Sequence, residues 1–382
     1  MAKLNADVLT WAVRRSGLSE EYIAKTFPKY HAWLDGSWKP TVKQLRDFAN
    51  KTCVSVSDLF ASEIPNYALQ IADFRTVDDA PKQDPSPELF DTIDAMLSRQ
   101  DWMRGYFLHE GFTRIDFVGS YMGAELSEGT RDRIVDDIRE LLGLGDSWAS
   151  SCKTVAEALR TLKDRVEAAG ISVVINGVVN DNTHRTLDVD EFRGFVLADD
   201  VAPIIFINGR DNKSAQIFTL VHELCHLAFS QTGVSNAADD KDSDVAMERF
   251  CNAVAADFLV PTSILANRLN VETAGLYSAL KTIAHACKVN FIVVARKAKD
   301  MGLIDEGAFF AAYRRYRNDM PTAVKVSKGG GDYFSNKRYK LGTVFSEAVL
   351  SAVHSDYLSY RDAYDLTGLS APSFKTYFEE VA

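Results

Sequence analysis

The chain has 382 residues, 46% of them hydrophobic and 25% charged, with a formal net charge of −10. This composition is ordinary for a globular protein, so disorder is not the default, and the length allows roughly two or three domains. The acidic balance argues against a protein that binds nucleic acid along its whole length. No apolar run approaches about 18 residues and the N-terminus lacks a signal-peptide segment, so we expect no membrane span. Five scattered cysteines, an odd number, are typical of free thiols, and we therefore expect a cytoplasmic protein.

Charge is distributed unevenly along the chain. Residues 1–62 contain nine Lys and Arg against six Asp and Glu, and residues 309–341 contain eight against two. A basic segment of an acidic protein can mark a surface for a partner, and the alternative is a solvated face without one. The sequence leaves both interpretations open for each segment.

Short helices are expected over the first 60 residues. Ser19 and Thr41 each precede apolar residues at helical spacing and are typical N-caps. Pro28 and Gly36 are typical of the start and the end of a short third helix between them. Residues 63–86 contain three prolines and indicate a linker after this all-α domain.

After the linker, apolar residues again recur at helical spacing. Two runs rich in β-branched residues follow these expected helices. The helices are expected at about 87–108, 129–143 and 153–169. Strands are expected at Val173–Val179, Gly194–Leu197 and Pro203–Ile207. These patterns predict a small sheet of about three strands among helices.

The rest of the chain is mostly helical in pattern. A helix is expected at about 214–230, a polar loop at 233–243, and a further helix that ends before Pro261. More helices run to about Tyr316, and a glycine-rich joint and a helical C-terminal segment follow, whose residues 359–380 resemble a small helix–turn–helix. We therefore predict a mostly helical α+β protein with domains at 1–62, 87–320 and 321–382.

The segment FTLVHELCHLAF, Phe218–Phe229, places two histidines one helical turn apart. Residues i and i+4 share a face of an α-helix, so His222 and His226 can direct imidazole nitrogens at one ion. Zinc accepts such ligands, and a catalytic site keeps one position for water. Glu223, on the flank of the same helix, could take the proton of that water. The spacing predicts a zinc-peptidase helix, and the alternative is a core helix that carries two histidines.

Three further features favour the metal site over that alternative. The helix has apolar residues for a core, and the strand PIIFIN before it could bind an extended substrate by strand addition. A downstream helix offers Glu248 as a third ligand, and Asn252, one turn later, could hydrogen-bond a ligand. Cys225 and Cys251 are interpreted as small buried thiols and not as ligands.

The segments RGFVLADDVAPIIFING, FTLVHELCHLAF and MERFCNAVAADFLVP resemble the ImmA/IrrE family of zinc-dependent metallopeptidases. The resemblance covers roughly residues 65–320 and implies a zincin-like domain. It implies His222, His226 and Glu248 as ligands of Zn²⁺ and Glu223 as the catalytic base. It also implies a protein substrate, a repressor or another regulator, in a mobile element or a stress response.

Metal-assisted hydrolysis of a peptide bond also needs a group that stabilises the oxyanion. The candidates are His184, in an expected loop before the strands, and His285, on a later helix. Neither spacing is diagnostic, and a structural histidine is the alternative for each.

Residues 6–60 resemble the XRE/Cro type of helix–turn–helix, with Trp33, Gly36, Pro40 and Leu45 at family-like places. The resemblance implies operator DNA as a partner, with the third helix in the major groove. The candidate DNA contacts are Lys25, Lys29, Tyr30, His31, Lys39 and Lys43. The alternative is a helical module for protein contact, including a homodimer.

The C-terminal segment from about residue 329 resembles the tail of proteins that accompany PIN-fold ribonuclease toxins. Two functions from different classes are therefore expected. One is a zinc endopeptidase that cleaves a regulatory protein, and the other is a non-proteolytic antitoxin and repressor that binds a PIN-like ribonuclease toxin and operator DNA. The intact Glu223 favours the first, because a structural metal site needs no base.

Overall fold

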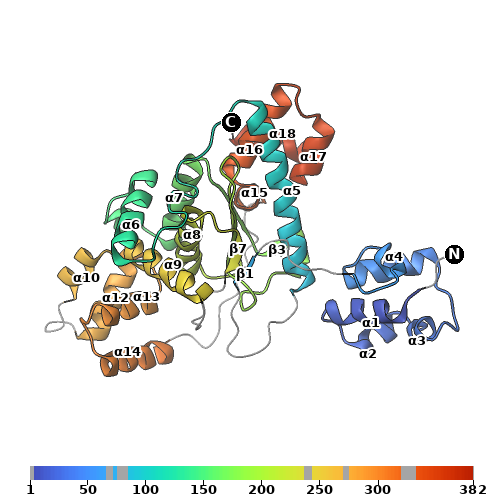
Figure 1. Ribbon diagram of the computed structural model, residues 1–382, viewed down its shortest axis with the longest axis horizontal. Helices are drawn as coiled ribbons and strands as arrows, with labels where there is room; N and C mark the ends of the chain where they lie inside the picture. Colours follow the sequence, from blue (N-terminus) through green and yellow to red (C-terminus); the bar gives the residue numbers. More distant parts are fainter. Residues whose placement is uncertain are drawn as a thin grey trace. The chain divides into compact units, whose positions relative to one another are not determined.

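The computed structural model describes residues 4–65, 72–74, 85–235, 243–269, 275–319 and 333–381. Contacts divide the chain into two units, one of Met1–Gln70 and Asp79–Ala95, and the other of Ile71–Asp78 and Met96–Ala382. Helices dominate the described residues, and the larger unit has a small mixed sheet in its middle (Figure 1). The predicted α+β, mostly helical class is confirmed. Most of the predicted linker at 63–86 lies outside the described residues.

The smaller unit begins with a bundle of short helices. They are α1 (Ala6–Arg15), α2 (Glu20–Thr26), α3 (Tyr30–Leu34), α4 (Val42–Thr52) and the 3₁₀ helix η1 (Asp58–Phe60). The Ser19 side chain accepts the Tyr22 amide, and Thr41 forms a capping box with Gln44, so the predicted N-caps are confirmed. Tyr30, Trp33 and Phe48 pack together in the core of this bundle.

The central sheet has five strands in the order β1-β7-β5-β6-β2. They are β1 (Ala72–Phe74), β7 (Gly233–Ser235), β5 (Gly194–Leu197), β6 (Ile204–Asn208) and β2 (Ser172–Asn176). Strand β5 is antiparallel to both of its neighbours, whereas β2 is parallel to β6 and β1 is parallel to β7. The expectation of about three strands missed β1 and β7, because three-residue strands carry no alternation that a sequence can show.

Two further differences concern the first β-branched run. The expected strand Val173–Val179 is broken at Gly177 into β2 and the short β3 (Val178–Val179). A Cβ at Gly177 would lie 2.8 Å from Cγ of Arg210, so the chain passes too closely for a side chain there. Strand β3 pairs with β4 (Asn182–Thr186), which was expected to be a loop.

Helices cover both faces of the sheet. On one side lie α7 (Val155–Ala168) and α8 (Lys213–Ala228), and on the other lies the part of α5 (Pro87–His109) that belongs to the larger unit, from Met96 onward (Figure 1). Side chains alternate along a strand, so Val196 and Ile205 join the core beneath α8, while Phe195 and Phe206 stack on the opposite face with their ring centroids 4.8 Å apart.

The next helices in the larger unit are α6 (Glu128–Leu142), the 3₁₀ helix η2 (Trp148–Ser151), α9 (Ser243–Leu259), α10 (Thr262–Arg268), α12 (Leu276–Cys287), α13 (Phe291–Asp300) and α14 (Glu306–Asp319). Of these helices, α6 and α9 pack against α8, and the others pack on those two or on one another. Among the described residues no single helix is long and apolar enough to cross a membrane, and one pair, α12 with α13, reaches that length and composition only across a 115° bend. Both helices contribute to the buried core.

The C-terminal region packs on the edge strand β2. It consists of α15 (Tyr333–Leu341), α16 (Thr343–His354), α17 (Tyr360–Thr367) and α18 (Ala371–Val381), with α15 and α16 against β2. Gly368, in the left-handed conformation, ends α17, and a tight turn leads into α18, which gives the expected small helix–turn–helix shape. The expected glycine-rich joint lies mainly outside the described residues.

Candidate metal centre

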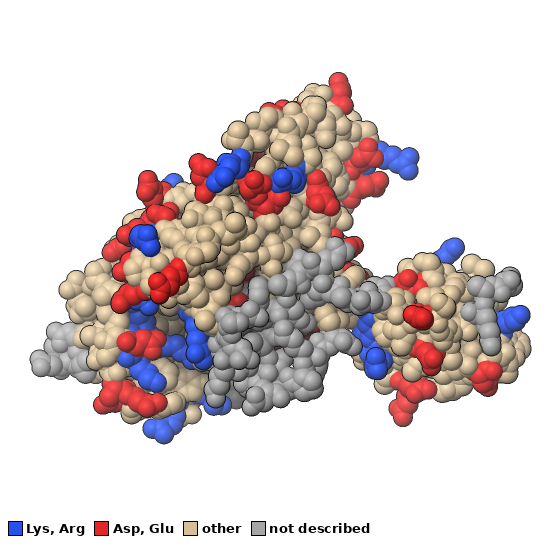
Figure 2. Space-filling view, in the orientation of Figure 1, with Lys and Arg blue, Asp and Glu red and all other residues tan. Residues whose placement is uncertain are grey.

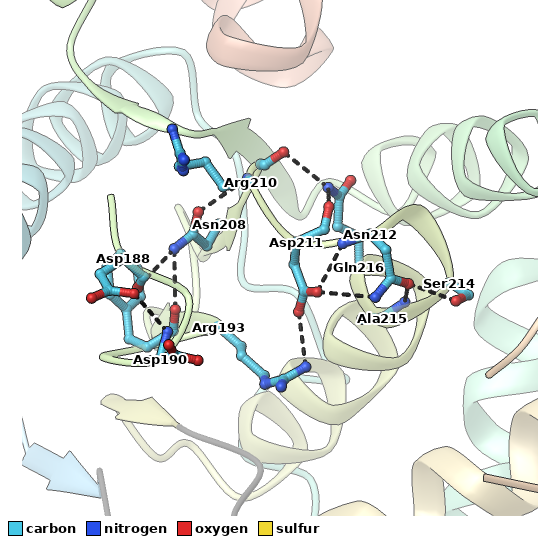
Figure 3. A network of polar contacts seen from close by, with 12 residues as sticks. Asp188, Asp190, Arg193, Asn208, Arg210, Asp211, Asn212, Ser214, Ala215 and Gln216 are labelled. Atoms are coloured by element: carbon cyan, nitrogen blue, oxygen red, sulfur yellow. Dashed lines mark hydrogen bonds and ion pairs between the residues drawn. The ribbon is translucent and has the colours of Figure 1, made fainter. Parts of the chain in front are cut away.

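Helix α8 positions the two histidines and is buried on nearly every side. Asn212 caps its first turn by accepting the Ala215 amide. A polar network fastens this end of the helix to the end of β6 (Figure 3): Gln216 donates to the carbonyls of Gly209 and Asp211, and the Asp211 carboxylate pairs with Arg193 at 2.9 Å. The helix therefore starts at a fixed place relative to the sheet.

The imidazoles of His222 and His226 and the carboxylate of Glu248 converge at one point between α8 and α9. Nε2 of His222 lies 3.1 Å from Oε2 of Glu248, and Nε2 of His226 lies 3.0 Å from Oε1. The two Nε2 atoms are 3.1 Å apart. Ligand atoms at zinc distances around a tetrahedral ion would be separated by roughly 3.3–3.5 Å. The structure thus brings together the three residues that were predicted as ligands, in a group that could hold a metal ion.

The donor atoms of this group fit a cation better than they fit one another. Both oxygens of Glu248 are buried, lie at ion-pair distance from imidazole nitrogens, and receive no aligned hydrogen bond from the described residues. Leaving such a carboxylate buried without a donor costs free energy, and a metal ion is one group that satisfies it. Two imidazoles and one carboxylate are also a typical ligand set for catalytic zinc.

The pKa values of Glu248 and His226 are shifted by their contact with each other. Burial by itself would raise the pKa of Glu248, but the contacts with His222 and His226 lower it to about 2. Burial would lower the pKa of His226, but the Glu248 carboxylate outweighs this and raises it to about 9. Because a metal ligand must be a neutral imidazole, a bound cation would take the place of any proton that His226 holds toward Glu248.

Glu223 is fully buried where α8 meets β5. A Cβ built on Gly194 of β5 would lie 3.0 Å from Oε1 of Glu223 and 2.6 Å from Cγ2 of Thr219. Only a glycine lets the strand pass this closely over the glutamate. The role of Gly194 was missed from the sequence, although a glycine inside a strand pattern is a known sign of close approach.

The outer nitrogens of the two imidazoles have different surroundings. Nδ1 of His226 lies 3.2 Å from Oε1 of Gln231, a residue that the sequence did not single out. Nδ1 of His222 and Oδ1 of Asn252 are both buried, and neither makes a hydrogen bond within the described part of the chain. The contact predicted for Asn252 with a ligand stays a prediction.

The two candidate oxyanion histidines lie on exposed surface. His184 is on β4 and not in a loop, and His285 is on α12 as expected. Over the described residues, no hydrogen bond or ion pair joins either histidine to the three converging side chains. Their role stays a prediction.

One expectation about substrate binding was wrong. The strand PIIFIN contains β6, which pairs with β5 on one side and with β2 on the other. Both edges of β6 are therefore already hydrogen-bonded, and it cannot accept an extended substrate by strand addition.

The candidate DNA contacts on the smaller unit divide into two groups. Tyr30 is 1% exposed and belongs to the core, so the expectation that it faces a base was wrong. The other candidates are exposed: Lys25, Lys29, His31, Lys39 and Lys43. His31 pairs with Glu20 at 3.6 Å, and acidic side chains lie among the basic ones on this unit in the view of Figure 2.

Some of the basic side chains in the second basic segment, residues 309–341, form ion pairs within the protein. Nζ of Lys337 is buried and lies 2.6 Å from Asp181, and Nζ of Lys340 lies 2.9 Å from the same carboxylate. These two lysines hold α15 to the turn between β3 and β4 and are not offered to a partner. The middle of the segment, residues 320–332, lies outside the described residues.

Two parts of the chain match known families. Residues 166–299 match the family described as the IrrE N-terminal-like domain, Peptidase_M78, and residues 341–380 match a domain of unknown function, DUF8813. No curated protein matches the chain. The first match includes α8, α9 and all three converging residues, and it supports the ImmA/IrrE family and a peptidase.

Proposed function

We propose that the chain is a zinc-dependent endopeptidase that hydrolyses a peptide bond in a regulatory protein. The observation that carries this proposal is the convergence of His222, His226 and Glu248 at 3.0–3.1 Å, with Glu223 buried beside the first histidine. The match of residues 166–299 to a peptidase family supports it.

In hydrolysis, three residues of the chain would bind the metal ion and a fourth would transfer protons. His222, His226 and Glu248 would hold Zn²⁺, which when bound supplies a Lewis acid that polarises the scissile carbonyl and acidifies a water. The Glu223 carboxylate accepts the proton of the attacking water and passes it to the nitrogen of the leaving amine. Burial of Glu223 against Gly194 keeps bulk water from competing for that proton. His184 or His285 would stabilise the oxyanion.

The substitution Glu223→Gln tests the proposal. We expect the variant to bind zinc as the wild type does, because no ligand changes, and to cleave about 10²–10⁴-fold more slowly, because the amide cannot accept the proton. Cleavage is measured by mass spectrometry on a library of unstructured peptides with the zinc-loaded full chain. Glu306→Gln, the same change on the exposed start of α14, is the control and should leave the rate unchanged. Equal rates for Glu223→Gln and the wild type would refute the role of the base.

The regulatory setting is a further part of the proposal. The substrate is a repressor or another regulator in a mobile-element, stress or toxin–antitoxin context, and the smaller unit supplies the contact to operator DNA. The exposed lysines Lys25, Lys29, Lys39 and Lys43 support the DNA contact, because phosphate contacts are typically made by such side chains. Replacing all four by alanine should abolish binding to promoter fragments at low salt.

A further inference from the structure

Gln231 contacts His226 through both its backbone and its side chain. Its amide N–H donates to the His226 carbonyl at 3.0 Å, and its Oε1 lies 3.2 Å from Nδ1 of the same imidazole. The histidine and the glutamine are five residues apart, on opposite sides of the turn that ends α8. The turn thus folds the amide group back onto the outer edge of the imidazole ring.

The turn that carries Gln231 is itself held in place. Ser230 is in the left-handed conformation with φ 55°, and its amide donates to the Leu227 carbonyl at 2.9 Å. Thr232, the next residue, accepts the Ala198 amide on its Oγ1 at 2.8 Å. Gly233 then begins β7, which pairs with β5. Gln231 is therefore fixed between the last turn of α8 and the sheet, and its side chain needs little ordering to meet the histidine.

The chemistry of the contact decides which nitrogen of His226 faces the converging group. A neutral imidazole carries one proton, and an amide oxygen at Nδ1 favours the form in which Nδ1–H donates. Nε2 then keeps its lone pair and points it toward Glu248 and His222. The hydrogen bond also fixes the plane of the ring, and such outer contacts typically change metal affinity by about 10–100-fold.

We propose that Gln231 is a positioning residue that holds His226 in the tautomer and orientation required for metal binding. This inference rests on the proposed zinc-peptidase function. It also predicts an asymmetry between the two histidines, because Nδ1 of His222 has no hydrogen-bond partner in the described part of the chain, whereas Nδ1 of His226 has Gln231.

Two substitutions of Gln231 separate the hydrogen bond from the shape of the side chain. Gln231→Met keeps the length of the side chain and removes the acceptor, and Gln231→Glu keeps an acceptor oxygen. The full chain is stripped of metal, and zinc affinity is measured by competition with a chelating dye, with the visible spectrum of bound Co²⁺ and the melting temperature of the metal-free protein as further readouts. We expect Gln231→Met to weaken zinc binding about 10–100-fold and to change the Co²⁺ spectrum, and Gln231→Glu to restore both. The metal-free melting temperature should be the same for all three proteins.

The outcomes distinguish this inference from the function on which it rests. If the wild type binds zinc and Gln231→Met binds it equally well, the positioning role is refuted and the proposed function stands. If both variants lose affinity together with melting temperature, Gln231 only stabilises the turn, and the inference is also refuted. If the wild type itself binds no zinc, the proposed function fails first.

Discussion

At the scale of single residues, Gly194 of β5 has the tightest surroundings among the glycines in the described part of the chain. A Cβ at this position would lie 2.6 Å from Cγ2 of Thr219, 2.9 Å from the Phe206 carbonyl oxygen and 3.0 Å from Oε1 of Glu223. The Phe206 oxygen is part of the backbone of β6 and Thr219 lies on α8, so an added methyl requires β5 to shift against both of these neighbours. The position of the proposed base therefore depends on the absence of a side chain on the neighbouring strand.

We expect Gly194→Ala to lower the free energy of unfolding by about 1–3 kcal/mol, as overpacking typically does. It should reduce kcat more than zinc affinity, because Oε1 of Glu223 is among the three atoms nearest the added Cβ, whereas no atom of the three proposed ligands is. Chemical denaturation and peptide cleavage measure the two effects. Gly129→Ala on α6 is the matched control: nothing lies within 4 Å of the added Cβ, so stability should be unchanged or slightly increased. A Gly194→Ala variant as stable and active as the wild type would contradict the packing argument.

At the scale of elements, α9 brings the third ligand, and its C-terminal end is held by cations. Lys297 of α13 donates to the Val260 carbonyl and lies 2.7 Å from Asp257, and Arg131 of α6 lies 2.8 Å from the same carboxylate. Burial lowers the pKa of Lys297, and Asp257 partly opposes this. Cations near a helix C-terminus are stabilising, so this cluster fixes the helix that carries Glu248.

Lys297→Met should lower the free energy of unfolding by about 3 kcal/mol, because it removes a buried partner from Asp257 and leaves the Val260 carbonyl without its donor. Zinc affinity should fall with it, since α9 is less firmly held. Lys299→Met, two residues further along α13, is the comparison, because its pair with Glu306 is on the surface and contributes little. If the two variants unfold at the same denaturant concentration, the cluster does not have the importance assigned to it.

At the scale of the whole molecule, the C-terminal region is a structural part of the larger unit. Arg99 of α5 is half-buried, donates to the carbonyls of Lys340 and Leu341, and lies over the ring of Phe345 with its Cζ 4.4 Å from the centroid. Glu167 of α7 accepts the Thr343 amide at 2.7 Å. Helices α15 and α16 thereby cover the edge strand β2.

Deleting residues 333–382 should therefore unfold or aggregate the larger unit and not simply remove an appendage. The deletion exposes the edge of β2 and its apolar surroundings, and it removes the two carbonyls to which Arg99 donates. Soluble yield, circular dichroism and zinc binding of the shortened chain measure the effect. A shortened chain that melts at the temperature of the full chain and binds zinc equally well would show that the C-terminal region is independent.

The sequence by itself determined what depends on local geometry. Four-residue spacing on a helix places His222 and His226 on one face whatever surrounds them, and a capping residue such as Thr41 acts within one turn. Glu248 was predicted from its pattern, and the structure brings it to the histidines. The segments that were missed or misassigned, β1, β4 and β7, are too short or too polar to show a strand pattern.

The tertiary structure decided every feature that depends on residues distant in the sequence or on the surroundings of a side chain. Strand pairing on both sides of β6 removed it as a substrate edge, and packing buried Tyr30. Gly194 acquires its importance only because β5 crosses α8 at Glu223, and Gln231 only because a turn directs it back to His226. Periodicity along a chain records which face a residue occupies, whereas contacts between elements depend on how those faces are brought together.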